Sequence, residues 1–246
     1  MSKATVARNT LVPLALQDAP ALIESVFPAQ KVSFEAQKER KANLGQTLTG
    51  LGSYWKGRKP LILVRAIVLG SLLPSTSDAE RDLETFEKCM AFDDEGLARR
   101  ALAAKAYSPI KLQQILSIPD PDRFFSGRSW RRDVGDEEKL ILYRSAIKTL
   151  ATYEERASLC KRPEEIDQEW LYEPVWPYLN HHYGYLGIAV YCFSDLIEQF
   201  GVLRYGRRPW VGDLFCGGGS IPFEAARIGC DVYSADLNPV ACMLTW

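Results

Sequence analysis

One stretch near the C-terminal end constrains the fold more than any other part of the chain. Residues 211–239 read VGDLFCGGGSIPFEAARIGCDVYSADLNP. A short apolar strand ends in Asp213, three consecutive glycines precede the helical sequence IPFEAARI, and a second strand, DVYSA, leads to Asp236. Glycines let a backbone approach a ligand closely, and the free amides at the start of a helix can face that ligand. The pattern predicts a strand–turn–helix–strand unit of an α/β sheet with a nucleotide-type cofactor site.

The spacing within this stretch narrows the class of cofactor. Gly217 and Gly219 begin a Gly-x-Gly-x-x-Gly pattern, but Pro222 stands where a dinucleotide site requires the last glycine. No Gly-Lys-Ser/Thr follows the loop, which argues against a phosphate-binding nucleotide hydrolase. Asp236 follows the loop at close to the roughly 20-residue spacing at which an acidic side chain accepts the hydroxyls of a ribose. A bare turn between strand and helix is the structural alternative.

Composition and charge exclude several other classes. The 30 Lys and Arg residues balance 31 Asp and Glu residues, so any contact with nucleic acid requires local basic patches. The longest apolar run, residues 60–74, contains Arg65 and is shorter than the roughly 20 residues of a membrane span. The six cysteines form no Cys-x-x-Cys pair, and the adjacent His181 and His182 cannot share a helix face. We expect a cytoplasmic protein that does not contact a membrane, with reduced thiols, no secretory signal and no metal site.

The chain divides into four predicted segments. They are a flexible lead-in (1–19), a helical segment with a basic-aromatic loop (20–74), a helical insertion (75–200) and the start of a cofactor-binding domain (201–246). The run after Pro60 is apolar nearly all round, which fits a buried helix or a buried strand, and the proline favours the helix. Ser77 and Glu80 are spaced as a capping box, and Gly201 is predicted to end a helix. The apolar spacing predicts helices over 21–27, 31–41, 61–73, 77–90, 95–107, 108–116, 137–160 and 193–200.

Two basic-aromatic stretches each have two interpretations. In the first, Tyr54 and Trp55 precede the cations of residues 56–59, which either decorate an anchored turn or hold an anionic group. In the second, cations and aromatic residues alternate over residues 123–132. This stretch is either an exposed connector or a grip on a phosphate backbone. Its residues are Arg123, Phe124, Phe125, Arg128, Trp130, Arg131 and Arg132.

The glycine loop also carries a resemblance to a known family. Asp213-Leu-Phe-Cys-Gly-Gly-Gly-Ser220 resembles the Asp-Pro-Phe-x-Gly-x-Gly-Ser/Thr loop of amino-group DNA methyltransferases, and residues 236–239, DLNP, resemble the ribose-binding strand end that follows it. Residues 53–61, SYWKGRKPL, are similar to the basic segment that precedes the loop in methylases with varied motif order. With KRPEEID at 161–167, the chain resembles the large adenine-specific DNA methylases that begin with a domain of unknown function, some of them found in anti-phage defence systems.

This resemblance implies a fold, a cofactor and a set of binding residues. The fold is α/β: a mostly helical N-terminal region leads into the start of a Rossmann-like methyltransferase sheet that is incomplete in this chain. The cofactor is S-adenosylmethionine, the implied substrate is DNA, and the methylated group is the exocyclic amine of adenine, with cytosine as the alternative. The glycines would lie against the methionine part, Phe215 near the loop wall, Asp236 on the ribose, and Leu237 with Asn238 beside the adenine, while Asp213 would orient the cofactor or the loop. The implied cofactor residues are Asp213, Phe215, Gly217, Gly218, Gly219, Asp236, Leu237 and Asn238.

One departure from the family pattern limits the implied activity. The Asp/Asn/Ser-Pro-Pro-aromatic tetrapeptide, which accepts hydrogen bonds from the target amine and stacks its base, does not occur in the 246 residues. We therefore assign no catalytic residue, and expect the N-terminal portion of a longer methylase or one half of a split one, with the catalytic half or other defence proteins as partners. The alternatives are a non-catalytic module that binds DNA or a partner through a degenerate methyltransferase fold, and a small-molecule or RNA methyltransferase.

Overall fold

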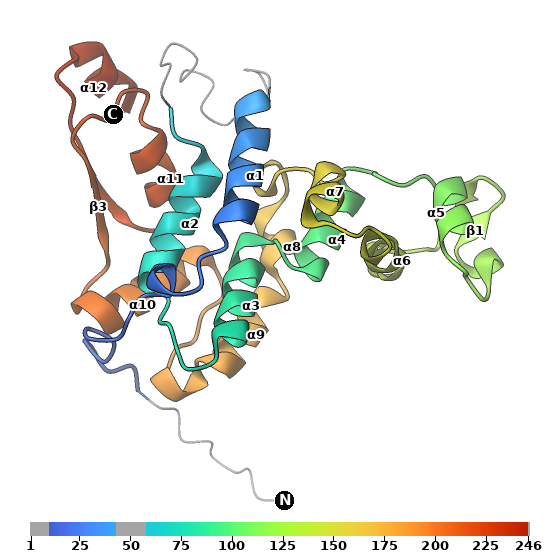
Figure 1. The fold of residues 1–246 in the computed structure, drawn as a ribbon, viewed down its shortest axis with the longest axis horizontal. Coiled ribbons are helices and arrows are strands. Elements are labelled where there is room, and N and C mark those ends of the chain that lie inside the picture. The colour runs from blue at the N-terminus through green and yellow to red at the C-terminus, as the bar shows by residue number, and fades with distance from the viewer. Residues whose placement is uncertain (1–9, 43–57, 246) are drawn as a thin grey trace, which may run out of the picture. The chain divides into compact units, whose positions relative to one another are not determined.

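The computed structural model describes residues 10–42 and 58–245, which form two compact units (Figure 1). The first combines residues 1–86 with 173–246, and the second comprises residues 87–172. The described part of the chain is mostly helical and contains two small two-stranded sheets. The fold is therefore of mixed class with helices in the majority, and a Rossmann fold is not shown.

The first unit is built from helices and one parallel strand pair. Its N-terminal part contains the 3-10 helix η1 (Leu22–Glu24), α1 (Ala29–Lys41), α2 (Leu61–Leu72) and most of α3 (Ala79–Met90). Its C-terminal part contains α9 (Val175–His182), η6 (Gly184–Leu186), α10 (Phe193–Tyr205), β3 (Trp210–Asp213), α11 (Ser220–Ile228), β4 (Asp231–Ser234) and α12 (Pro239–Thr245). β3 and β4 run parallel with Trp210 opposite Asp231, and α11 forms the crossover between them. This β-α-β unit has the element order that the glycine-rich stretch predicts.

Helix α2 is the centre of the first unit. It contacts α1, α10 and α11, and eight of its residues are buried, which explains why its sequence is apolar nearly all round. The Glu39 carboxylate of α1 accepts hydrogen bonds from the backbone amides of Leu61 (3.0 Å) and Ile62 (3.3 Å). These bonds satisfy two amides at the start of α2 that have no partner within the helix. The helix that Pro60 favours is thus confirmed.

A single buried arginine connects the C-terminal end of α2 to the residues around it. The guanidinium of Arg204 on α10 donates to five backbone carbonyl groups, at distances of 2.5–3.4 Å. These carbonyls belong to Leu16, Ala19, Pro20, Leu72 and Leu73. Burial lowers the pKa of Arg204, and the carbonyl dipoles offset part of that cost of charge burial.

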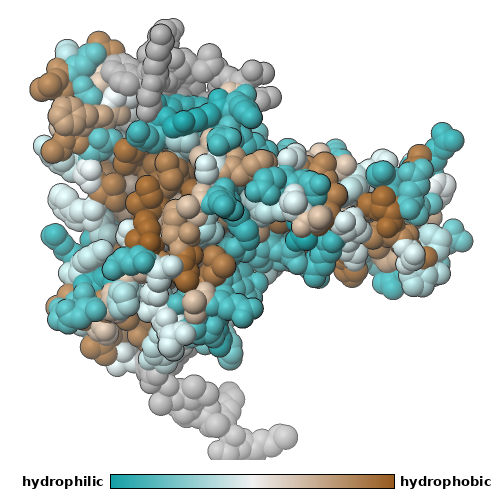
Figure 2. Space-filling model, in the orientation of Figure 1, coloured by the Kyte–Doolittle hydropathy of each residue, from teal (hydrophilic) through white to brown (hydrophobic). Residues whose placement is uncertain are grey.

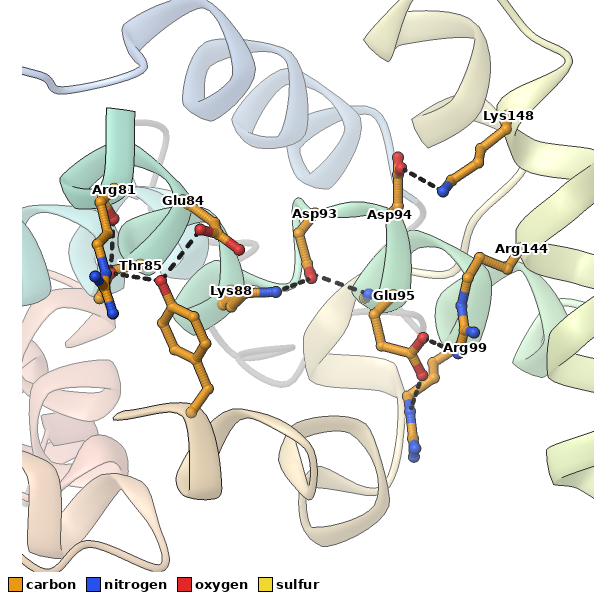
Figure 3. Close-up of polar contacts among 12 residues, drawn as sticks. Arg81, Glu84, Thr85, Lys88, Asp93, Asp94, Glu95, Arg99, Arg144 and Lys148 are labelled. Carbon is orange, nitrogen blue, oxygen red and sulfur yellow. Dashed lines mark hydrogen bonds and ion pairs between the residues drawn. The ribbon is translucent and has the colours of Figure 1, made fainter. Parts of the chain in front are cut away.

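The second unit is helical with one short hairpin. Its elements are α4 (Asp94–Ala103), α5 (Pro109–Ile115), η4 (Pro121–Arg123), β1 (Phe125–Ser126), β2 (Ser129–Trp130), α6 (Asp136–Lys148), α7 (Tyr153–Ser158), η5 (Pro163–Glu165) and α8 (Gln168–Tyr172). Asp93 caps α4 by accepting a hydrogen bond from the Gly96 amide. Two ion pairs lie at the N-terminal end of α4: Lys88 pairs with Asp93, and Lys148 of α6 pairs with Asp94 (Figure 3).

Several sequence-based boundaries are wrong. The helix predicted over 137–160 is two helices, because Thr152 and Glu155 form a capping box that starts α7. Asp78, rather than Ser77, caps α3 by accepting from the Arg81 amide. Residues 21–27 contain only the single turn η1. Gly201 lies inside α10, which ends at Gly206 with a left-handed φ of 70°.

Candidate cofactor-binding site

The glycine loop connects β3 to α11 and is closed by hydrogen bonds to its own flanks. The Asp213 carboxylate accepts from the Phe215 amide (3.1 Å), which turns the chain at the end of β3. The Cys216 amide donates to the Ala235 carbonyl (3.1 Å), which ties the loop to the residue after β4. Gly217 and Gly219 have φ values of 50° and 74°, a region that side chains disfavour. A Cβ atom on Gly219 would also lie 3.0 Å from Thr245 Oγ1 on α12.

Asp236 lies across the loop from Gly217. One carboxylate oxygen accepts from the Gly217 amide and the other from the Asn238 amide, both at 2.8 Å. The hydrogen bonds from Asn238 and Gly217 lower the pKa of Asp236 below its ordinary value of 3.8. A carboxylate has about four acceptor positions, so each oxygen can still accept one further hydrogen bond. The structure thus brings Gly217, Asp236 and Asn238 together at one point.

Two apolar side chains project beside this point. Phe215 is 76% exposed and Leu237 is 90% exposed, although both are large and apolar. Gly218 lies between the two positive-φ glycines and is partly exposed. Exposed apolar side chains next to free acceptors give a surface that can contact the apolar part and the hydroxyls of one ligand. Of the eight predicted residues, Asp213 contacts the loop backbone rather than this surface.

The segment before α2 reaches the same loop. The backbone amide of Lys59 donates to Ser220 Oγ at 3.1 Å, joining positions that are 161 residues apart. Ser220 is the first residue of α11 and directly follows Gly219. The C-terminal end of the predicted basic-aromatic loop therefore adjoins the glycine loop. Tyr54, Trp55 and Lys56 of that prediction lie outside the described residues.

A buried ion pair fixes α11 against α2. Arg65 Nε donates to Glu224 Oε1 at 2.8 Å, and both side chains are almost completely buried. Arg227 binds both oxygens of Glu224, at 2.6 and 2.9 Å. The Arg65 guanidinium also lies 5.0 Å from the centre of the Phe193 ring. The sequence motifs include neither Arg65 nor Glu224, although each is a charged residue among the apolar residues of its helix.

The second predicted basic-aromatic stretch forms the β1–β2 hairpin region of the second unit. Phe125 is buried and its ring lies 4.8 Å from that of Trp130, so the aromatic residues staple the hairpin. Arg123 pairs with Glu138, and Arg131 pairs with Asp133. Arg128 and Arg132 are exposed. The aromatic residues of this stretch therefore have a structural role in the hairpin. Its exposed cations are the residues that a phosphate backbone would contact.

The described residues show neither a metal cluster nor a membrane helix. No group of three or more His, Cys, Asp and Glu side chains in residues 10–42 and 58–245 is placed to hold a metal ion. His181 and His182 lie at the C-terminal end of α9. Within the same residues, every helix is too short or too polar to cross a membrane.

Comparison with known proteins gives one partial match. Residues 26–89 match a family model described as a protein of unknown function, DUF1156. No match to a curated protein or to a solved structure was found. The matched segment includes α1, α2 and most of α3, and it agrees with the expected N-terminal domain of unknown function. Helix α2 of this segment is the one that packs against α11 beside the glycine loop.

Proposed function

We propose that the first unit binds S-adenosylmethionine and that the chain is part of a DNA methyltransferase acting on the exocyclic amine of adenine. The hydrogen bond between the Lys59 amide and Ser220 Oγ carries this proposal. It joins the two segments that resemble methylase motifs, which the sequence separates by more than half of the chain. The contact places the segment before α2 next to the glycine loop, as a shared cofactor site requires.

The loop geometry fits the proposed cofactor. Gly217 and Gly219 keep side chains away from the space next to α11, where the methionine part of the cofactor would lie. The remaining acceptor capacity of Asp236 suits the two ribose hydroxyls, and the exposed Leu237 and Phe215 side chains suit the adenine and the loop wall. Asn238 is held beside Asp236 by its backbone amide and would lie beside the adenine.

In the proposed reaction, the residues of this chain hold the cofactor in position and do not catalyse methyl transfer. S-adenosylmethionine supplies a methyl group on a positively charged sulfur, which an amine nitrogen can attack. The residues around the glycine loop hold the cofactor, and the Arg65–Glu224 pair holds α11, which carries Ser220 at its start. Because the proline-containing tetrapeptide is absent from the sequence, we expect no methylation of DNA by this chain alone. The catalytic half of the enzyme is the expected partner, and phage defence is the expected setting.

DNA contact is assigned to local cations. The net charge of −1 gives no general attraction for a polyanion. Arg128 and Arg132 are exposed at the hairpin of the second unit. If these cations contact phosphates, duplex DNA binding weakens as salt is raised, and Arg128→Ala with Arg132→Ala reduces the steepness of that dependence. Binding that neither salt nor the double variant alters would count against a DNA substrate.

Titration calorimetry with S-adenosylmethionine tests the cofactor assignment on the 246-residue chain. We expect Asp236→Ala and Gly217→Val each to weaken binding by a factor of about ten or more, which is about 1.4 kcal/mol. The first removes the acceptor for the ribose hydroxyls, and the second adds a side chain at a position with a φ of 50°, beside the proposed cofactor. Asp231→Ala, on the exposed start of β4, is the matched control for the carboxylate. Gly184→Val is the control for the glycine, since no atom lies within 4 Å of a Cβ at that position. Unchanged affinity in both site variants would rule the assignment out.

A further inference from the structure

A cavity lies within the second unit, at the C-terminal end of α4. Its walls come from this helix end, the start of α5, β2, α6 and residues 161–170. Its volume of about 820 Å³ is within the roughly 300–1,000 Å³ of small-molecule sites. Around α5, Figure 2 shows apolar side chains directly beside hydrophilic ones. The walls of the cavity have the same mixed character, because they combine aromatic rings with lysines.

Two partly exposed tryptophans line the cavity. They are Trp130 on β2 and Trp170 on α8, and a neighbouring side chain already holds each ring. The centre of the Phe125 ring lies 4.8 Å from that of Trp130, and the Arg99 guanidinium lies 5.0 Å over the centre of the Trp170 ring. Indole rings fixed in this way lose little freedom when a flat ring stacks on them. The cavity therefore offers aromatic surface that is in place before a ligand arrives.

Two lysines of the wall are available to an anion. Lys105 and Lys161 are exposed, and neither forms an ion pair within residues 10–42 and 58–245. The Lys161 amide donates to the Arg100 carbonyl (3.2 Å), and the Lys161 carbonyl accepts from the Arg100 guanidinium (2.9 Å). Lys105 directly follows the C-cap of α4, the helix that carries Arg100. Both lysines are therefore anchored at the same helix end, and an ammonium group is a common phosphate ligand.

The carboxylates of the wall do not cancel these two charges. Asp136 pairs with Lys139 (2.8 Å), and Glu165 pairs with the Arg162 guanidinium (3.1 Å). The third carboxylate, that of Asp167, accepts a hydrogen bond from a backbone amide of α8 (2.8 Å). Two unpaired ammonium groups thus remain against one carboxylate that caps a helix, which favours a ligand with negative charge.

One buried hydroxyl of the wall lacks a partner. Tyr107 is 7% exposed, and its hydroxyl forms no hydrogen bond within the described part of the chain. The same segment is held by Tyr143, whose hydroxyl donates to the Tyr107 carbonyl at 2.9 Å. Lys105, two residues earlier, has a left-handed φ of 52°. Strained backbone and unpaired buried groups each cost stability, and proteins retain them mainly where a site uses them.

We propose that this cavity binds a nucleotide. The base stacks on the indole rings of Trp130 and Trp170, and the phosphate group is held by Lys105 and Lys161. Such stacking accepts any base, because every base has a flat π face. The bases of duplex DNA are stacked on one another, so the ligand is a free nucleotide or an unpaired nucleotide of a single strand. The inference does not depend on cofactor binding, which concerns the first unit.

Titration calorimetry with thymidine 5′-monophosphate tests the proposal on the 246-residue chain without S-adenosylmethionine. The probe contains neither the adenine nor the ribose of that cofactor. We expect it to bind more tightly than thymidine or 2-deoxyribose 5-phosphate, because each of these makes only part of the contacts. Lys105→Gln with Lys161→Gln weakens binding of the monophosphate by a factor of ten or more and leaves that of thymidine unchanged. Lys111→Gln with Lys148→Gln, at two lysines of the same unit outside the cavity wall, is the matched control and alters neither affinity.

The stacking contact is tested by Trp170→Leu. This change weakens binding of thymidine and of its monophosphate by similar factors, because both use the ring. Circular dichroism checks that the variant is folded, and the lysine variants test the site without any change in its aromatic residues. Unchanged affinity for the monophosphate in folded Trp170→Leu would count against the cavity as a base-binding site.

A single-stranded thymidine tetranucleotide distinguishes the two sources of the ligand. If it binds more tightly than the monophosphate, and Lys105→Gln with Lys161→Gln removes that gain, the ligand is a nucleotide of a strand. Equal or weaker binding assigns the cavity to a free nucleotide. Three results would overturn the proposal: no binding at millimolar monophosphate, equal losses in the two double lysine variants, and binding of 2-deoxyribose 5-phosphate as tight as that of the monophosphate.

Discussion

Each unit holds one glutamate between two arginines, but with very different exposure. In the first unit, Glu224 contacts Arg65 and Arg227, and its side chain is 0% exposed. In the second unit, Glu95 contacts Arg99 and Arg144, and its side chain is 21% exposed (Figure 3). In each triad one guanidinium also lies 5.0 Å from an aromatic ring centre, Arg65 from Phe193 and Arg99 from Trp170.

The difference between the triads reflects what each one joins. Arg65 and Glu224 are 159 positions apart and connect α2 to α11, the helix that follows the glycine loop. Glu95 and Arg99 are neighbours on α4, and Arg144 comes from the adjacent α6. A solvated pair contributes little to stability, whereas a buried charge that loses its partner is costly. We therefore expect the ion pairs of Glu224 to be required for the stability of the first unit, and those of Glu95 to contribute little to the stability of the second.

The largest expected effect comes from removing the buried carboxylate. Glu224→Gln keeps the shape of the side chain but removes the carboxylate charge beside the buried Arg65 guanidinium, which costs about 3–5 kcal/mol. Urea denaturation gives the total loss, and hydrogen exchange measured by mass spectrometry shows whether α2 and α11 are the segments that open. A loss below about 1 kcal/mol would mean that water reaches this pair.

A double variant separates the charge effect from packing. In Arg65→Met with Glu224→Leu both buried charges are gone, while Arg227 stays partly exposed and solvated. Replacing a buried ion pair by apolar side chains is often neutral or stabilising. We therefore expect the double variant to recover most of the stability lost in Glu224→Gln.

A smaller effect is expected from the matching change in the second unit. Glu95→Gln leaves Arg144 with access to solvent, and the buried Arg99 keeps its contact with Glu137, so the loss is about 0.5–1 kcal/mol. Arg99 also keeps its hydrogen bond to the Trp170 carbonyl. Urea denaturation at low and high salt measures the loss, which shrinks as salt is raised because solvent-accessible pairs are screened. A loss as large as that of Glu224→Gln would show that burial does not distinguish the triads.

Local sequence signals predicted the element types better than the element ends. The glycines at 217, 219 and 229 and the intervening apolar residues gave α11 and its two strands correctly, because those signals act within a few residues. Gly201 was wrongly predicted to end a helix, because glycine is needed there for steric reasons. A Cβ there would lie 2.4 Å from Pro209 Cδ, a contact made when α10 and the segment before β3 pack together. Such a requirement arises from tertiary structure and leaves no local pattern.

The candidate site was predictable only in part, for a similar reason. The residues of the loop and Asp236 lie within one short stretch, and their spacing is visible in the sequence. Arg65 is the single charge of the apolar helix α2, which signals a buried partner without identifying it, and Glu224 shares α11 with Arg227. The pairing of Lys59 with Ser220 uses a backbone amide, so no side-chain pattern could reveal it.

After Glu224 and Glu95, the smallest effect on global stability is expected at Asp236, because its carboxylate binds only amides of the neighbouring loop. Hydrogen bonds from the Asn238 and Gly217 amides lower the pKa of Asp236, so the loop contacts are fully present above the ordinary value of 3.8. They are lost as pH falls through the lower pKa of the folded state. Nuclear magnetic resonance signals of the Gly217 and Asn238 amides should therefore shift with a midpoint below 3.8, while α2 and α11 stay protected from exchange. In Asp236→Asn the same amides should show no such transition. A midpoint at or above the ordinary value would mean that these amides do not hold the carboxylate, and Gly217 would then be free to turn its amide toward the cofactor.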